Sequence, residues 1–168
     1  PRDGGRVGSP GLVPQCLGGP GVTDRPAPVS RADFPLFYTL ESRWADNDIY
    51  GHINNVVYYS YFDTAANRYL IEQGGLDIND GSVVGYVVNS GCAYHAPLAH
   101  PDELEAGVRV DRLGTSSVQY GIAIFRKGAS TAAANGHFVH VFVERAKDKS
   151  VPIPLNIRSA LEKILVSG

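Results

Sequence analysis

Apolar and polar residues alternate with a period of two along much of the chain. Leu36, Tyr38 and Leu40 occupy every second position ahead of Trp44, which predicts a strand over about 34–40. The same alternation recurs later. It predicts four more strands, at about 83–95, 103–113, 116–126 and 132–145. The breaks between these strands are short, which is typical of an antiparallel meander.

A different spacing, of three and four residues, follows the first strand. Apolar side chains recur in this way from residue 56 to the glycine pair at 74–75, which predicts an amphipathic helix of about five turns. The apolar stripe is formed by Val56, Tyr59, Phe62, Ala66, Tyr69 and Leu70. A short second helix is predicted at about 155–165, after two prolines.

These elements predict one α+β domain. The long helix comes early and no helices alternate with the later strands, so the sheet should be antiparallel with the long helix laid across one face. Residues 1–30 are crowded with glycine and proline and lack apolar periodicity. This composition predicts a flexible N-terminal tail ahead of a folded domain over 31–168.

Charge, hydropathy and cysteine content limit the binding partners and the cellular compartment that the sequence predicts. Lys and Arg total 15 and Asp and Glu total 17 in 168 residues, so the net charge of -2 gives no electrostatic case for nucleic acid. No apolar run approaches the roughly 20 residues of a membrane helix, so no membrane association is expected. Cys16 lies in the tail and Cys92 in a strand, which argues against a disulfide framework and for a cytoplasmic location.

A dense polar cluster lies between the first strand and the long helix. The segment 43–55 reads R-W-A-D-N-D-I-Y-G-H-I-N-N and contains two carboxylates, an imidazole, a glycine and several amides. If Asp48 lies where the helix begins, a carboxylate is held beside free backbone N–H groups that can receive an oxyanion. That pairing of groups suits acyl transfer.

Four motifs together resemble one known family. They are D-x-D-x-x-G-H-x-N-N at 46–55, L-G-T-S-S-V at 113–118, G-H-F-V-H-V-F-V at 136–143 and V-P-I-P at 151–154. From about residue 34 to 165 the chain resembles hotdog-fold acyl-CoA thioesterases related to 4-hydroxybenzoyl-CoA thioesterase. The resemblance implies a five-stranded antiparallel sheet wrapped around one long central helix, with a short C-terminal helix.

The resemblance also implies roles for residues of the first motif. Asp48 would be the catalytic carboxylate, and the backbone N–H of Asn55 would polarise the thioester carbonyl. Gly51 would be the point where the loop approaches the substrate closely. The G-H-I-N-N portion is similar to plant acyl-carrier-protein thioesterases, in which His52 would be catalytic and Tyr50 stands in the place of an asparagine.

Other interpretations of the same residues are structural. Asp46 is expected to hold the loop by Asx hydrogen bonds, and the side chains of Asn54 and Asn55 to cap the helix. We expect Tyr50, Gly51 and Asn54 to lie beside the substrate, and Asn54 to do so in addition to capping the helix.

Metal sites are not indicated by the sequence. The D-x-D-x-Y-G segment is similar to the start of a calcium loop, but Tyr50 and Val57 occupy positions that need oxygen ligands. His137 and His140 are three apart in a predicted strand, so they face opposite sides of the sheet. We therefore expect neither a metal ion nor a cofactor.

The function expected from the resemblance is hydrolysis of an acyl-CoA to the free acid and CoA. An acyl-carrier-protein thioester is an alternative substrate, and Asp48 could act as nucleophile or as general base. Two other functions stay open at this point, a hotdog enoyl-CoA hydratase and a non-catalytic acyl-CoA binding protein. The family forms dimers or tetramers with active sites at the dimer seam, so a homodimer or homotetramer is expected.

Overall fold

The computed structural model describes residues 26–166 of the chain. Its main helices are α1 (Asn55–Glu72) and α2 (Leu155–Glu162), and two single turns of 3₁₀ helix are η1 (Arg31–Asp33) and η2 (Trp44–Asp46). The strands are β1 (Leu36–Leu40), β2 (Val83–Tyr94), β3 (Leu104–Leu113), β4 (Ser117–Arg126), β5 (Ala134–Glu144) and β6 (Lys149–Ser150).

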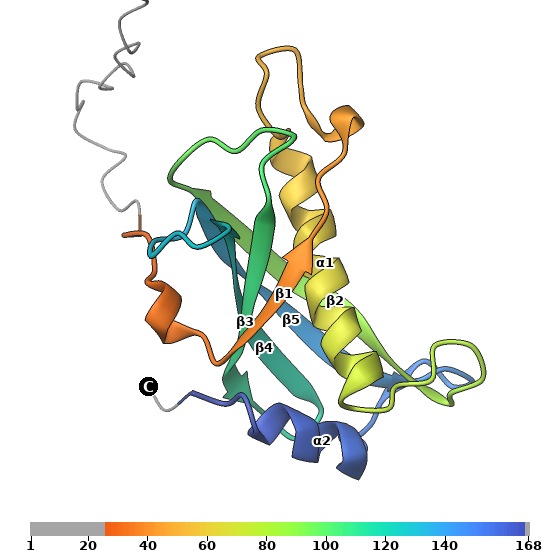
Figure 1. The fold of residues 1–168 in the computed structure, drawn as a ribbon. Helices are drawn as coiled ribbons and strands as arrows, with labels where there is room; N and C mark the ends of the chain where they lie inside the picture. Colours follow the sequence, from red (N-terminus) through yellow and green to blue (C-terminus); the bar gives the residue numbers. More distant parts are fainter. Residues whose placement is uncertain (1–25, 167–168) are drawn as a thin grey trace, which may run out of the picture.

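All strand pairs are antiparallel, and the five long strands lie in the order β1-β3-β4-β5-β2. The two-residue strand β6, which the alternation does not predict, pairs with the end of β5. Helix α1 crosses one face of this sheet, and α2 lies near the far end of α1 (Figure 1). The predicted fold, an antiparallel sheet around one long helix with a short C-terminal helix, is confirmed.

The buried side of α1 differs in part from the predicted stripe. Its buried residues are Tyr58, Tyr61, Phe62, Ala65, Ala66, Tyr69 and Leu70. Val56, which we placed in the stripe, is 64% exposed, and Tyr59 is only half-buried. Each helical residue turns by about 100°, so Val56 lies about 200° from Tyr58 and points away from the sheet.

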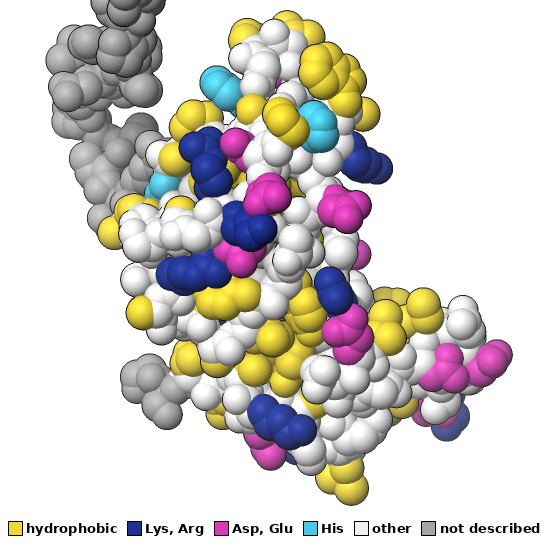
Figure 2. Space-filling model, viewed as in Figure 1, with side chains coloured by type: hydrophobic (Ala, Val, Ile, Leu, Met, Phe, Trp, Pro, Cys, Tyr) yellow, Lys and Arg dark blue, Asp and Glu magenta, His cyan; other side chains and the backbone are white. Residues whose placement is uncertain are grey.

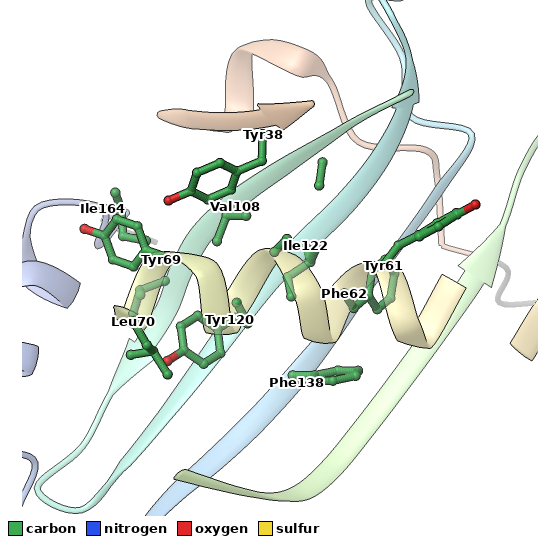
Figure 3. Packing of buried hydrophobic residues seen from close by; sticks show 14 of the residues in the cluster. Tyr38, Tyr61, Phe62, Tyr69, Leu70, Val108, Tyr120, Ile122, Phe138 and Ile164 are labelled. Atoms are coloured by element: carbon green, nitrogen blue, oxygen red, sulfur yellow. The ribbon is translucent and has the colours of Figure 1, made fainter. Parts of the chain in front are cut away.

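The main core fills the space between α1 and the sheet. Figure 3 shows Phe62 of α1 together with Tyr120, Ile122 and Phe138 of the strands. Alternate residues of β3 from Leu104 to Val110 and of β4 from Val118 to Ile124 are buried here, as the alternation predicts. Tyr69 of α1 also donates a hydrogen bond of 2.5 Å from its hydroxyl to the carbonyl of Ala160, which ties α2 to the core.

A smaller cluster covers part of the opposite face of the sheet. It is formed by Phe34, Ala123, Phe125 and Ala132, with Val29 and Phe37 packed against it. The guanidinium carbon of Arg31 lies 4.1 Å from the centre of the Phe37 ring, so a cation covers this cluster. The sequence patterns do not predict this second cluster.

The N-terminal part of the described chain is attached to the sheet. The carbonyl of Val29 accepts a hydrogen bond from Ala132, and Ser30 forms a bridge with Thr131. The boundary of the tail, predicted at residue 30, therefore lies within a segment that contacts the chain ahead of β5. Residues 1–25, with Cys16, lie outside the described residues.

The last helix ends three residues earlier than predicted. Beyond its last residue, Glu162, the chain turns, and Leu165 forms a bridge with Val110 of β3. Among the described helices, none combines the length and the apolar character that crossing a bilayer requires.

Candidate active site

The polar cluster forms a loop at the N-terminal end of α1 (Figure 1, orange). Hydrogen bonds attach this loop to the segment that follows β2. The amide of Ile53 donates to the carbonyl of Leu98 at 2.8 Å, and the amide of His100 donates to Oδ1 of Asn47 at 2.9 Å. Two segments about fifty residues apart in the sequence therefore meet beside the helix start.

Asp46 is the buried anchor of the loop. Its side chain is 1% exposed and accepts hydrogen bonds from the backbone and guanidinium of Arg43 and from the hydroxyl of Tyr61. Burial raises the pKa of Asp46, but the hydrogen bonds from Arg43 and Tyr61 outweigh burial, so its pKa is lowered overall. The carboxylate is therefore kept ionised, and the structural role predicted for Asp46 agrees with these contacts.

Asp48 forms a tight turn two residues further on. Its Oδ1 accepts the amides of Tyr50 at 2.8 Å and His52 at 3.4 Å, and its own amide donates to the carbonyl of His52. Gly51 has φ +79°, a left-handed conformation that glycine adopts without strain. One carboxylate oxygen of Asp48 thus holds the turn, while Oδ2 makes no hydrogen bond within residues 26–166.

Helix α1 starts directly after this turn. Asn54 is the N-cap, and its side-chain oxygen accepts the amide of Val56 at 3.2 Å. Asn55 is the first helical residue, so its backbone N–H has no intrahelical acceptor. No other acceptor for this N–H occurs in the described part of the chain. A backbone donor is therefore left free where the positive end of the helix dipole lies.

A cavity of about 370 Å³ brings the carboxylate and the helix start together. It is lined by Asp48, His52, Ile53, Asn55, Tyr58, Tyr94, His95, Ala96 and Pro97. A carboxylate can attack an acyl carbon or activate a water, and a free N–H at a helix start can stabilise the oxyanion that forms. This cavity is the candidate active site.

The residues predicted from the sequence divide into two groups. Asp48, His52 and Asn55 line the cavity together. Tyr50, Gly51 and Asn54 do not line it, although Tyr50 and Gly51 belong to the same turn and Asn54 caps the helix. A methyl group built on Gly51 would meet no atom within 4 Å, so its backbone conformation, and not crowding, requires glycine.

The opposite wall of the cavity comes from the end of β2 and is not predicted by the sequence patterns. Tyr94 donates a hydrogen bond of 2.9 Å from its hydroxyl to the carbonyl of Asn55, and so supports the first turn of α1. Tyr58 is buried in the core and also lines the cavity, and burial raises its pKa to about 12. The Y-H-A-P segment at 94–97 carries these groups, but only the fold brings it to Asp48.

Large apolar side chains of the loop itself are exposed. Trp44, Ile49 and Tyr50 are 81%, 93% and 79% exposed. Figure 2 shows hydrophobic side chains gathered at the upper end of the molecule with histidines beside them. An exposed apolar surface therefore lies beside the Asp48 turn.

No group of metal ligands accompanies the cavity. Within the part of the chain that the structure describes, no three His, Cys, Asp or Glu side chains come close enough to hold a metal ion. His140 is buried on the helix side of the sheet, whereas His137 lines a different hollow, as their spacing predicts.

Comparison with known proteins agrees with this geometry. A family model described as the thioesterase-like superfamily matches residues 42–161, which include the Asp48 loop, α1 and the four long strands that follow. The chain belongs to the thioesterase-like superfamily.

Solved structures of this superfamily's fold include several similar proteins. The PA5185 protein of Pseudomonas aeruginosa is 54% identical, with 83% of this chain and 98% of that chain covered and a TM-score of 0.82. The PA2801 protein of the same species is 31% identical, covering 74% of this chain and 96% of its own, with a TM-score of 0.69. A thioesterase of Thermus thermophilus in complex with coenzyme A and zinc is 30% identical, covering 79% and 95%, with a TM-score of 0.64.

Proposed function

We propose that this protein is a thioesterase that hydrolyses an acyl-CoA to the free acid and CoA. The observation that carries the proposal is the meeting of Asp48 and the free backbone N–H of Asn55 in one cavity. Membership of the thioesterase-like superfamily supports the reaction class. The Thermus relative that binds coenzyme A supports CoA as the thiol carrier in preference to an acyl carrier protein.

The reaction follows from these two groups. The thioester carbonyl oxygen accepts the Asn55 N–H, which makes the carbonyl carbon more electrophilic. Asp48 then removes a proton from a water as the water oxygen bonds to that carbon, or its carboxylate attacks the carbon directly and the resulting anhydride is hydrolysed. In either route the carbon–sulfur bond breaks, and the electron pair leaves with the CoA thiolate.

A homo-oligomer is part of the proposal. Strand β2 lies at one edge of the sheet, so one side of its backbone has no partner strand within residues 26–166. Tyr86, Val87 and Val88 near its middle are 47%, 45% and 59% exposed. An exposed apolar edge strand pairs readily with another strand. We therefore assign β2 as the seam of a homodimer, from which a homotetramer can be built.

The test is thiol release from a panel of acyl-CoA thioesters by the wild type and by Asp48→Asn. We expect kcat of Asp48→Asn to be lower by at least about a hundredfold, the low end for a proton-transfer group. Asp77→Asn is the matched control, because Asp77 also holds a turn through Oδ1 but does not line the cavity. Asp77→Asn should keep wild-type kcat.

Three results would overturn the proposal. Full activity of Asp48→Asn would remove Asp48 from the reaction. Loss of an enoyl-CoA chromophore without release of thiol would identify a hydratase. Tight binding of acyl-CoA with no turnover of any panel member would identify a binding protein.

A further inference from the structure

Tyr94 connects the sheet to the start of α1. It is the last residue of β2, where it pairs with Ala134 of β5, so the sheet fixes its backbone. Its hydroxyl donates a hydrogen bond of 2.9 Å to the carbonyl of Asn55, and both residues line the candidate active site. Its ring packs edge-on against Tyr58 of α1, with the ring centroids 5.2 Å apart. A side chain of β2 therefore holds the first helical residue.

The carbonyl of Asn55 can accept this bond in addition to its helical one. A backbone carbonyl has two lone pairs, and in a helix one of them accepts the N–H four residues further on. The other lone pair is available to the Tyr94 hydroxyl. Burial raises the pKa of Tyr94, so its hydroxyl keeps its proton near neutral pH and remains a donor.

The backbone around the free N–H of Asn55 is held on both sides. The peptide unit before Asn55 contains this N–H and the carbonyl of Asn54, which lie in one plane. That carbonyl accepts the amide of Val57 at 2.9 Å, and the amide of Asn54 donates to the carbonyl of Asp46 at 2.9 Å. The peptide unit after Asn55 is held by Tyr94. The helix and the loop thus fix one side of Asn55, and the sheet fixes the other.

We infer that Tyr94 is a positioning residue, whose hydroxyl holds the backbone N–H of Asn55 at the place that the oxyanion of the reaction requires. The inference rests on the proposed thioesterase function. Donors to an oxyanion act at about 2.7 to 3.1 Å, so a small displacement of the donor is costly to the rate. The negative charge develops only as the carbonyl carbon is attacked. Loss of the positioning should therefore lower kcat and leave KM nearly unchanged.

The first test removes only the hydroxyl. In Tyr94→Phe the ring can still pack against Tyr58, while the carbonyl of Asn55 loses one donor. The substrate is the acyl-CoA that the panel shows to be best hydrolysed. We expect kcat to fall roughly fivefold to fiftyfold, less than the hundredfold or more that is lost when an oxyanion donor is removed outright. KM should stay within about twofold of the wild-type value.

A second substrate separates positioning from general damage to the fold. In the dithioester analogue of the same acyl-CoA, sulfur replaces the carbonyl oxygen and accepts hydrogen bonds only weakly. The N–H of Asn55 should then contribute little to the transition state, so Tyr94→Phe should lower kcat on the dithioester by less than about twofold. General damage would instead lower kcat equally on both substrates.

Tyr69→Phe is the matched control. The hydroxyl of Tyr69 likewise donates to a backbone carbonyl, that of Ala160, at 2.5 Å, but Tyr69 does not line the cavity. Tyr69 is buried and Tyr94 only half-buried, so Tyr69→Phe should lower the free energy of unfolding at least as much as Tyr94→Phe does. It should nevertheless keep the wild-type kcat. Urea denaturation and kcat measured on both variants therefore separate stability from positioning.

The outcomes distinguish the positioning role from the function on which it rests. The role of Tyr94 is overturned by a wild-type kcat in Tyr94→Phe, by a rise in KM without loss of kcat, or by equal losses on the thioester and the dithioester. It is also overturned if Tyr69→Phe loses as much kcat as Tyr94→Phe. In each of these cases Asp48-dependent hydrolysis stands. Absence of hydrolysis of every thioester by the wild type overturns the proposed function, and the positioning role with it.

Discussion

Asp46 and Asp48 are two residues apart but lie in opposite environments. Asp46 is buried and fully engaged by Arg43 and Tyr61, whereas Asp48 lines a cavity with one oxygen free of partners among the described residues. The two carboxylates therefore have separate duties, Asp46 in stability and Asp48 in the proposed chemistry.

Substitution of Asp46 should lower stability. Asp46→Ala leaves the buried Tyr61 hydroxyl and the Arg43 amide without an acceptor, and each loss costs about 1 to 3 kcal/mol. We expect the free energy of unfolding to fall by about 3 kcal/mol in urea denaturation. Tyr61→Phe, which removes one of these contacts, should cost less. A value for Asp46→Ala within about 0.5 kcal/mol of the wild type would contradict the anchoring role.

His140 is the buried histidine of the core. It is 1% exposed, and neither ring nitrogen has a hydrogen-bond partner among the described residues. The centroids of the His140 and Tyr120 rings are 5.2 Å apart. Burial lowers the pKa of His140, and the charge of Asp63 opposes this only in part. The folded protein therefore favours the neutral form of the His140 imidazole.

Stability should therefore depend on pH in the range where histidine titrates. In the unfolded chain His140 takes up a proton at its ordinary pKa of about 6.5, whereas in the folded protein it does so only at lower pH. The contribution of neutral His140 to the free energy of unfolding is therefore complete above about pH 6.5 and is lost as pH falls. The loss should reach at most about 1.4 kcal/mol per pH unit. Urea denaturation at about pH 7.5 and 5.5, on either side of that pKa, measures it. His140→Leu should reduce the difference between the two values, and an unchanged difference would contradict this assignment.

At the scale of elements, the start of α1 contributes both to stability and to the proposed chemistry. The Asn54 side chain caps the helix whose next residue, Asn55, has the free N–H. Asn54→Ala should lower the free energy of unfolding by about 1 kcal/mol, whereas Asn54→Asp should retain it, because a carboxylate oxygen can accept the same amide. Equal stabilities of all three proteins in thermal denaturation would contradict a capping role.

The elements themselves were largely accessible to sequence reasoning. Period-two alternation located the five long strands, and the spacing of Phe62, Ala66 and Tyr69 located α1, because both patterns reflect burial against one partner surface. The loop of Asp48 was visible from its dense polar composition. Tyr94 and His95 were not, since they are nearly fifty residues away in the sequence and reach the cavity only through the pairing of β2 with β5.

At the scale of the whole molecule, the two edges of the sheet differ. β1 is a five-residue edge strand, whereas β2 is a twelve-residue edge strand with exposed apolar residues and a register shift between Val87 and Asn89. The covered cluster around Phe34 reduces the apolar surface on the sheet face away from α1. The edge of β2 is the better candidate for contact with a second copy.

A charge on this edge should disrupt the proposed dimer. We expect the wild type to sediment as a dimer or tetramer and Val88→Lys to shift towards the monomer, because the symmetric seam would then have to accommodate two added positive charges. Arg112→Lys, an exposed change on β3, is the control. A monomeric wild type at micromolar concentration in analytical ultracentrifugation would contradict the assignment of β2.

The attachment of the Asp48 loop to the segment after β2 has a consequence for the energetics of recognition. Ile53 and Asn47 fasten the loop to Leu98 and His100, so the carboxylate and the helix start are already arranged before any ligand arrives. The entropic cost of ordering this loop is part of the free energy of folding, so it does not weaken the binding of a ligand. Preorganisation of this kind favours tight recognition of a rigid transition state over adaptive closure around a flexible substrate.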